Sequence, residues 1–83
     1  MIDAKRAVLI AKEKSDEMIG VVGSLEEIER DSYKGREIWS ITLGFPSTGF
    51  NNVLNGLRDY KRFLIDAETG DLVAMKLREV ALP

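Results

Sequence analysis

Cysteine and histidine are both absent from the 83 residues of this chain. Without cysteine there is no disulfide, no thiolate nucleophile and no thiolate metal site. Without histidine the chain lacks the commonest general base and the commonest metal ligand of proteins. Serine with lysine, or paired carboxylates, are the remaining routes to catalysis, and no spacing in the sequence brings such a pair together. We therefore predict a protein that is not an enzyme and that uses no cofactor or metal.

Long apolar segments and an excess of positive charge are also missing. The apolar run at residues 7–11 stops at Lys12 and is too short for the core of a signal peptide. No later segment approaches the length that spans a membrane. We therefore predict a cytoplasmic protein without a membrane segment. The net charge of −2 gives no long-range attraction to phosphate backbones, which predicts that nucleic acid is not a partner.

What the chain does contain is an ordinary globular composition, with 45% hydrophobic and 31% charged residues. A chain of this length has room for one hydrophobic core, so residues 1–83 are predicted to form a single domain. A domain this small needs most of its apolar side chains for that core. A deep, enclosed ligand cavity is therefore not expected.

The first regular segment begins at Asp3 and has the pattern of an amphipathic helix. Asp3 is predicted to cap the amino end of this helix, and Gly20 and Gly23 end the pattern. The residues predicted to share the buried stripe are Ala4, Ala7, Val8, Ala11 and Met18.

Residues 24–33 have an ambiguous pattern, because Ser-Leu-Glu-Glu-Ile-Glu could also begin a second helix. We predict a strand, because the Tyr-Lys-Gly-Arg sequence at 33–36 resembles a tight hairpin turn. After this turn, apolar residues alternate with polar ones at Trp39, Ile41 and Leu43. A two-residue loop then places Ile28 opposite Ile41.

A second hairpin is predicted from the strands 58–66 and 71–80, which flank the turn at 67–70. Gly70 is suited to the left-handed position of that turn. This register predicts two pairs on one face, Ile65 with Val73 and Phe63 with Met75, and two on the other, Arg62 with Lys76 and Leu64 with Ala74.

The segment at 45–56 lies between the two hairpins and is predicted to be a loop or a brief helical turn. Gly44 and Gly49 have the spacing of a phosphate-binding loop, but Phe50 and Asn51 replace the lysine and hydroxyl residues that such a loop needs. The apolar side chains of this loop are expected to cap the core, and the alternative is a partner-binding tip: Phe50, Val53 and Leu54.

One helix followed by two hairpins predicts an α+β fold in the order α-β-β-β-β. In this fold the N-terminal helix packs on one face of a four-stranded antiparallel sheet. The residues that the helix is expected to cover are Trp39, Ile41, Leu43, Phe63, Ile65, Val73 and Met75. The opposite face is expected to be uncovered.

This uncovered face is predicted to carry Glu27, Glu29 and Asp31 on one side and basic residues on the other. One explanation is a solvated face whose charges keep the sheet soluble. The other is recognition, because a two-fold copy could place each acidic side against a basic side and bury apolar residues, Leu72 among them. Recognition predicts a homodimer with the binding residues Ile38, Arg58, Tyr60, Arg62, Leu64, Lys76 and Arg78.

The run from Tyr60 to Val73, with Asp-Ala-Glu-Thr-Gly at 66–70, resembles the repeat of PepSY-type domains. The resemblance implies a cystatin-like α+β module. Its family is usually extracellular or membrane-attached, and is thought to bind or inhibit peptidases or to sense at envelopes. This chain departs from that family because no signal or membrane segment is predicted.

The second half of the chain is also similar to the conserved half of the gas vesicle protein O family, whose members are accessory proteins of a cytoplasmic assembly. The residues whose order carries this likeness are Trp39, Pro46, Leu54, Tyr60, Asp66, Gly70, Leu72 and Arg78. Neither family donates catalytic residues. We therefore predict a non-enzymatic protein-interaction or regulatory module that binds a second copy or another protein. The alternative is a small-ligand-binding domain or enzyme that uses the 45–56 loop against Trp39.

Overall fold

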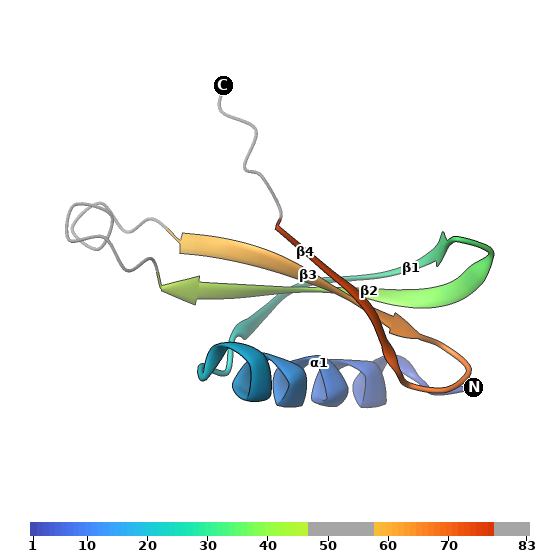
Figure 1. The fold of residues 1–83 in the computed structure, drawn as a ribbon, viewed down its shortest axis with the longest axis horizontal. Coiled ribbons are helices and arrows are strands. Elements are labelled where there is room, and N and C mark those ends of the chain that lie inside the picture. Colours follow the sequence, from blue (N-terminus) through green and yellow to red (C-terminus); the bar gives the residue numbers. More distant parts are fainter. Residues whose placement is uncertain (47–57, 78–83) are drawn as a thin grey trace, which may run out of the picture.

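The computed structural model of the chain describes residues 1–46 and 58–77. One helix and four strands form in the predicted order, and the four strands make one antiparallel sheet in the order β1-β2-β3-β4. Helix α1 lies along one face of this sheet (Figure 1). The predicted α+β fold is therefore confirmed. The elements are α1 (Ala4–Ile19), β1 (Ser24–Tyr33), β2 (Arg36–Pro46), β3 (Arg58–Asp66) and β4 (Leu72–Leu77).

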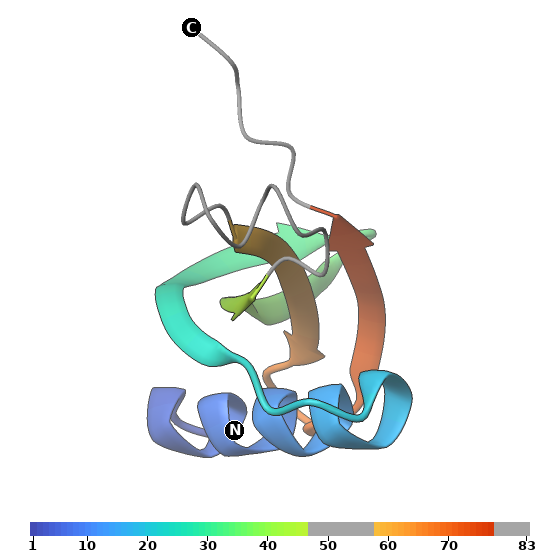
Figure 2. The same ribbon diagram turned by 90° about the vertical axis from the view of Figure 1, so that its left-hand side faces the viewer.

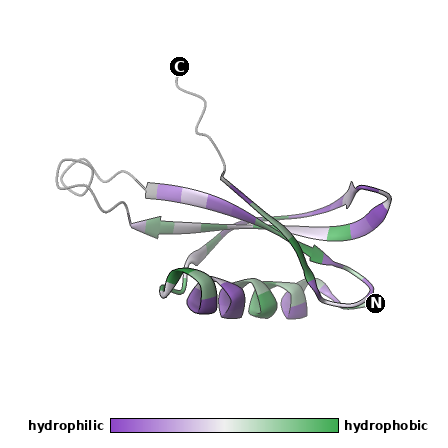
Figure 3. Ribbon diagram, in the orientation of Figure 1, coloured by the Kyte–Doolittle hydropathy of each residue, from purple (hydrophilic) through white to green (hydrophobic). Residues whose placement is uncertain are grey.

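Both ends of α1 form as the sequence predicts. The Asp3 carboxylate accepts a hydrogen bond from the Arg6 backbone N–H at 2.8 Å, which satisfies one of the free donors at the amino end. Gly20 has a φ of 84° and donates its N–H to the Asp16 carbonyl at 3.0 Å. That left-handed position suits glycine, so the helix stops there. Figure 3 shows hydrophilic and hydrophobic residues following one another along α1, as expected of an amphipathic helix.

The buried stripe of α1 consists of small side chains, Ala7, Ala11 and Ser15. Ser15 was not predicted there, because a polar residue does not usually signal burial. Its hydroxyl donates to the Lys12 carbonyl at 2.8 Å and accepts from the Gly23 N–H at 3.4 Å, so this buried group is hydrogen-bonded. The prediction that Met18 joins the stripe is wrong, since Met18 is 54% exposed. It lies in the last turn of α1, beside residues 70–72 at the β4 edge of the sheet.

The first hairpin has the predicted two-residue loop. Lys34 and Gly35 both have positive φ angles, 50° and 79°, which is the conformation that matches the twist of a tight hairpin. Ile28 lies opposite Ile41, as predicted. One β-bulge interrupts the ladder at Glu26, near the start of β1.

The second hairpin follows the predicted register except at one position. The pairs of Arg62 with Lys76, Phe63 with Met75 and Leu64 with Ala74 are confirmed. The predicted pair of Ile65 with Val73 is wrong, because Ile65 lies opposite Leu72. The reason is a β-bulge, in which Val73 is an extra residue on β4. The β4 residues before Val73 therefore lie on the opposite face from the one predicted. Leu72 therefore packs against the core beside α1 and is absent from the opposite face where we expected it.

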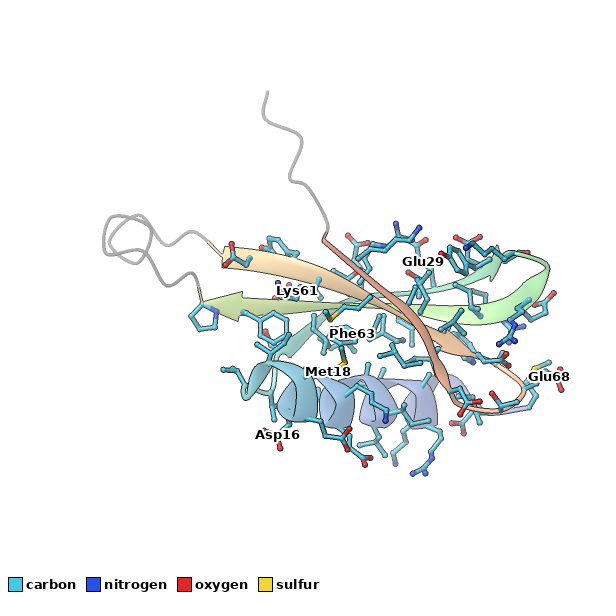
Figure 4. All side chains as sticks on the ribbon, viewed as in Figure 1. Asp16, Met18, Glu29, Lys61, Phe63 and Glu68 are labelled. Carbon is cyan, nitrogen blue, oxygen red and sulfur yellow. The ribbon has the colours of Figure 1, made fainter. Side chains whose placement is uncertain are left out.

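The core lies between α1 and the sheet. It is built by buried residues of β2 and β3 packed on the small residues of the helix: Ala7, Ala11, Ile41, Leu43, Phe45, Phe63 and Ile65. Figure 4 shows Phe63 in the layer between β3 and α1. Trp39 is half-buried at the border of this core, where its indole N–H donates to the Ile2 carbonyl at 3.1 Å. The predicted burial of Met75 is not observed, since its side chain is exposed.

Asp66 organises the turn between β3 and β4. Its buried carboxylate accepts the backbone N–H groups of Glu68 at 2.8 Å and Thr69 at 3.1 Å, and the guanidinium of Arg36 lies 3.2 Å away. These backbone hydrogen bonds, Glu68 first and then Thr69, hold the pKa of Asp66 below its usual value, with Arg36 adding to the effect. The ionised carboxylate therefore stabilises the folded state.

We expect Asp66→Asn to lower the melting temperature at pH 7 and to remove part of its pH dependence. Because the folded-state pKa of Asp66 is lowered, its contribution is present above the unfolded pKa of about 4 and is lost as the pH falls through the lower folded value. Thermal melts between pH 7 and pH 2 test this. Asp71→Asn is the matched control, and equal acid sensitivity of Asp66→Asn and the wild type would contradict the assignment.

Candidate functional site

The twist of the strands curves the face of the sheet opposite α1. A right-handed twist raises two diagonal corners of a sheet toward each other on each face. Here those corners are the carboxyl end of β1 and the carboxyl end of β4, and Figures 1 and 2 show β4 running obliquely to the other strands. The Lys76 ammonium lies 4.7 Å from the centre of the Tyr33 ring, although β1 and β4 are the two outer strands. The predicted open face is therefore concave and partly closed.

Two of the predicted binding residues are buried on this concave face. Ile38 is 1% exposed and Leu64 is 3% exposed, so both are already buried within a single chain. The expectation that they lie on an uncovered face is wrong. The physical reason is the approach of Tyr33 and Lys76 across that face, which the alternation of residues along each strand does not encode. A second copy of the chain cannot gain stability by burying these two side chains.

The remaining predicted residues fall into two groups. Arg62 and Lys76 lie on the concave face, and the half-buried Tyr60 lies on β3 opposite Gly44. Arg58 begins β3, but its side chain is outside the described part of the structure. Arg78 is outside the described residues altogether, as are the loop side chains Phe50, Val53 and Leu54.

A small polar cavity of about 190 Å³ opens on the concave face. Three strands supply its lining in order, carboxylates from β1, hydroxyls from β2 and a guanidinium from β3: Glu27, Glu29, Ser40, Thr42 and Arg62. Arg62 donates two hydrogen bonds to the Ser40 hydroxyl, at 3.3 and 3.2 Å, and forms no ion pair with the described residues. Thr42, which lines the same cavity, is 2% exposed. Figure 4 shows Glu29 on the side of the sheet away from α1.

A second surface, which the sequence reading missed, lies where α1 meets the outer strand β1. Its five apolar side chains are between 36% and 55% exposed: Ile19, Val21, Val22, Leu25 and Ile28. We call this set the α1–β1 edge. Leu25 and Ile28 lie opposite the core residues Leu43 and Ile41, so they project on the same face as α1. Their exposure follows from position, because β1 has a neighbouring strand on one side only.

The same strand is acidic on its other face. Glu29 and Asp31 point away from α1, and the Glu29 carboxylate forms no hydrogen bond or ion pair with any described residue. Among the described residues, the Asp31 carboxylate accepts only the N–H of the next residue, Ser32, at 2.7 Å. β1 therefore presents an apolar row beside α1 and an acidic row on the opposite face. The signal for this surface was the Val21-Val22 pair between two glycines, but only the tertiary structure shows that β1 is an outer strand.

Residues 1–46 and 58–77 contain neither a metal-binding cluster nor a membrane-spanning helix. No group of three or more acidic side chains in these ranges is arranged to hold a metal ion. None of the described helical structure is long and apolar enough to cross a membrane.

No family model, curated protein or solved structure matches the chain. The likenesses to PepSY-type domains and to the gas vesicle protein O family therefore remain predictions.

The burial of Ile38 can be tested against Ile28, the isoleucine on the other face of the first hairpin. We expect Ile38→Ala to reduce the free energy of unfolding by about 2–5 kcal/mol, because it leaves a cavity in a closed region. Ile28→Ala removes the same atoms from a 38% exposed site and is expected to cost about 1 kcal/mol or less. Urea unfolding of both variants measures the difference. Equal losses would show that the concave face is open in solution.

Proposed function

We propose that this chain is a protein-interaction module that binds its partner through the α1–β1 edge. The observation that supports the proposal is the exposure of five large apolar side chains within ten residues of sequence, at the end of α1, in the connection after it and at the start of β1. Contiguous apolar surface of this kind marks interaction sites on small proteins, because leaving it in water costs free energy that a partner recovers. The proposal keeps the predicted class of function and moves the binding surface from the concave face to the edge of the sheet.

A charge introduced at this edge is expected to abolish partner binding without unfolding the chain. Val22→Lys places an ammonium in the centre of the α1–β1 edge, and Leu9→Lys is the matched control. Leu9 is similarly exposed, but it lies on the outer side of α1, away from β1, by the 100° step of the helix. Both variants should melt within a few degrees of the wild type.

The measurement is quantitative affinity capture from an extract of the cells that make the protein. Proteins retained by the wild type and by Leu9→Lys, but lost with Val22→Lys, are the expected result. Capture that both variants preserve, or lose equally, would contradict a role for the α1–β1 edge.

A second candidate function is supported by the polar cavity on the concave face. An acidic residue and a basic residue face it from opposite sides, with Thr42 on the strand between them. This arrangement suits a small zwitterion such as a free amino acid, with its ammonium toward Glu29 and its carboxylate toward Arg62. The volume of about 190 Å³ limits the ligand to a small molecule.

We expect glycine or alanine to produce saturable NMR shifts at the amides of Ser40 and Thr42, and expect methylammonium or acetate alone to bind at least tenfold more weakly. Arg62→Met should remove the response. Lys61→Met, the neighbouring substitution on the other face of β3, should retain it. Shifts that sodium chloride reproduces, or that persist in Arg62→Met, would eliminate this candidate.

A further inference from the structure

The outer side of β1 carries backbone N–H and C=O groups that take no part in pairing with β2. In a hairpin with a two-residue loop, the residues that flank the loop form a hydrogen-bonded pair, here Tyr33 with Arg36. Hydrogen-bonded pairs then recur at every second residue, so Asp31 and Glu29 direct their backbone groups toward β2. The alternate residues turn their N–H and C=O groups outward: Ile28, Arg30 and Ser32.

These outward groups differ in how far they are already satisfied. Ser32 donates its N–H to the Asp31 carboxylate at 2.7 Å. Ile28 and Arg30 direct their backbone N–H and C=O groups away from β2. Outside the pairing of the four strands, these groups form no backbone hydrogen bond with any described residue. An edge in this state can accept one more strand, because the added strand supplies the missing donors and acceptors.

The side chains around this edge specify what kind of strand fits. A residue placed opposite Ile28 would contact the exposed apolar row beside α1, which favours an apolar side chain. Residues opposite Glu29 and Asp31 would face the acidic row, which favours basic side chains. In an antiparallel strand the matching order is basic, any residue, basic, apolar.

A second copy of β1 does not meet this requirement. A two-fold pairing centred on Ile28 places Glu29 opposite Glu27 twice, and one centred on Glu29 places this residue opposite itself. A pairing centred on Arg30 places Glu29 opposite Asp31 twice. Each register sets like charges directly opposite one another, which destabilises an antiparallel pair. Self-pairing through β1 is therefore disfavoured by charge.

From these observations we propose that β1 accepts an extended segment of another protein as a fifth strand, and that this segment has the order basic, any residue, basic, apolar. The proposal rests on the proposed function and specifies its partner chemistry. The added strand would hydrogen-bond to Ile28 and Arg30, place basic side chains against Glu29 and Asp31, and cover part of the α1–β1 edge.

Two synthetic peptides test this inference. The peptide TKTKVTV has the matching order, and TETEVTV is its acidic twin. Fluorescence anisotropy should give saturable binding of the basic peptide to the wild type below 1 mM, with the acidic peptide at least tenfold weaker. The double variant Glu29→Lys, Asp31→Lys should reverse this preference. Absence of saturable binding at 1 mM, or no reversal in the double variant, would overturn the proposal.

Hydrogen exchange followed by NMR tests the location. The outward amides of Ile28 and Arg30 should exchange at least tenfold more slowly with the peptide bound, whereas the amide of Glu29, already bonded to β2, should change little. A peptide with methylated backbone nitrogens should not bind. Peptide binding without slower exchange at Ile28 and Arg30 would overturn strand addition.

Light scattering of the chain without peptide tests whether β1 binds a second copy of the chain instead of another protein. A wild-type dimer that dissociates in Val22→Lys would assign the edge to a second copy and overturn the proposal of a different partner. Loss of peptide binding alongside captured proteins that still depend on Val22 would refute strand addition and leave the proposed function intact. If the captured proteins do not depend on Val22 but the peptide still binds, the proposed function is refuted and strand addition at β1 stands.

Discussion

The right-handed twist of the four-stranded sheet is the constraint on which the distribution of surfaces in this protein depends. It brings the carboxyl ends of β1 and β4 together on the face away from α1, so that Lys76 reaches the ring of Tyr33. A flat sheet with one helix would leave that face to solvent. Because the sheet is twisted, Ile38 and Leu64 are buried there, although the described residues form no second layer on that face. The chain thus gains buried apolar area on both faces, which is valuable for a domain of this size.

The same twist does not protect the outer strand. β1 has one neighbouring strand, and α1 crosses the sheet without covering the side chains at the start of β1. A bulge at Glu26 and the acidic row of Glu29 and Asp31 reduce unspecific pairing of this edge, as is common for outer strands. The apolar row beside α1 has no such protection. A surface that repels its own copy and still exposes apolar side chains is suited to a partner of opposite charge.

Local hydrogen bonding explains why the register of the second hairpin differs from the predicted one at Ile65. Asp66 gathers the turn by accepting two backbone N–H groups, and its own N–H donates to the Asp71 carbonyl at 2.8 Å. With the turn closed by this pair, β4 has one residue more than its partner strand needs, and Val73 becomes the bulge. Leu72 consequently faces the core instead of the concave face. The hydrogen-bonded turn and the bulge together determine which residues of β4 lie on the core face of the sheet and which lie on the concave face.

The sequence by itself determined the elements and the pairing within each hairpin except at one bulge, because these depend on neighbours along the chain. Asp3 and Gly20 bound the helix, the Lys34-Gly35 loop sets the first hairpin, and alternation places Ile41 and Phe63 in the core. Tertiary structure alone decided exposure. Whether Ile38 is covered depends on two strands that are far apart in the sequence, and whether Ile28 is covered depends on the absence of a neighbour beside β1 in the sheet. Recognition surfaces depend on exposure, so the sequence predicted the fold more completely than the candidate site.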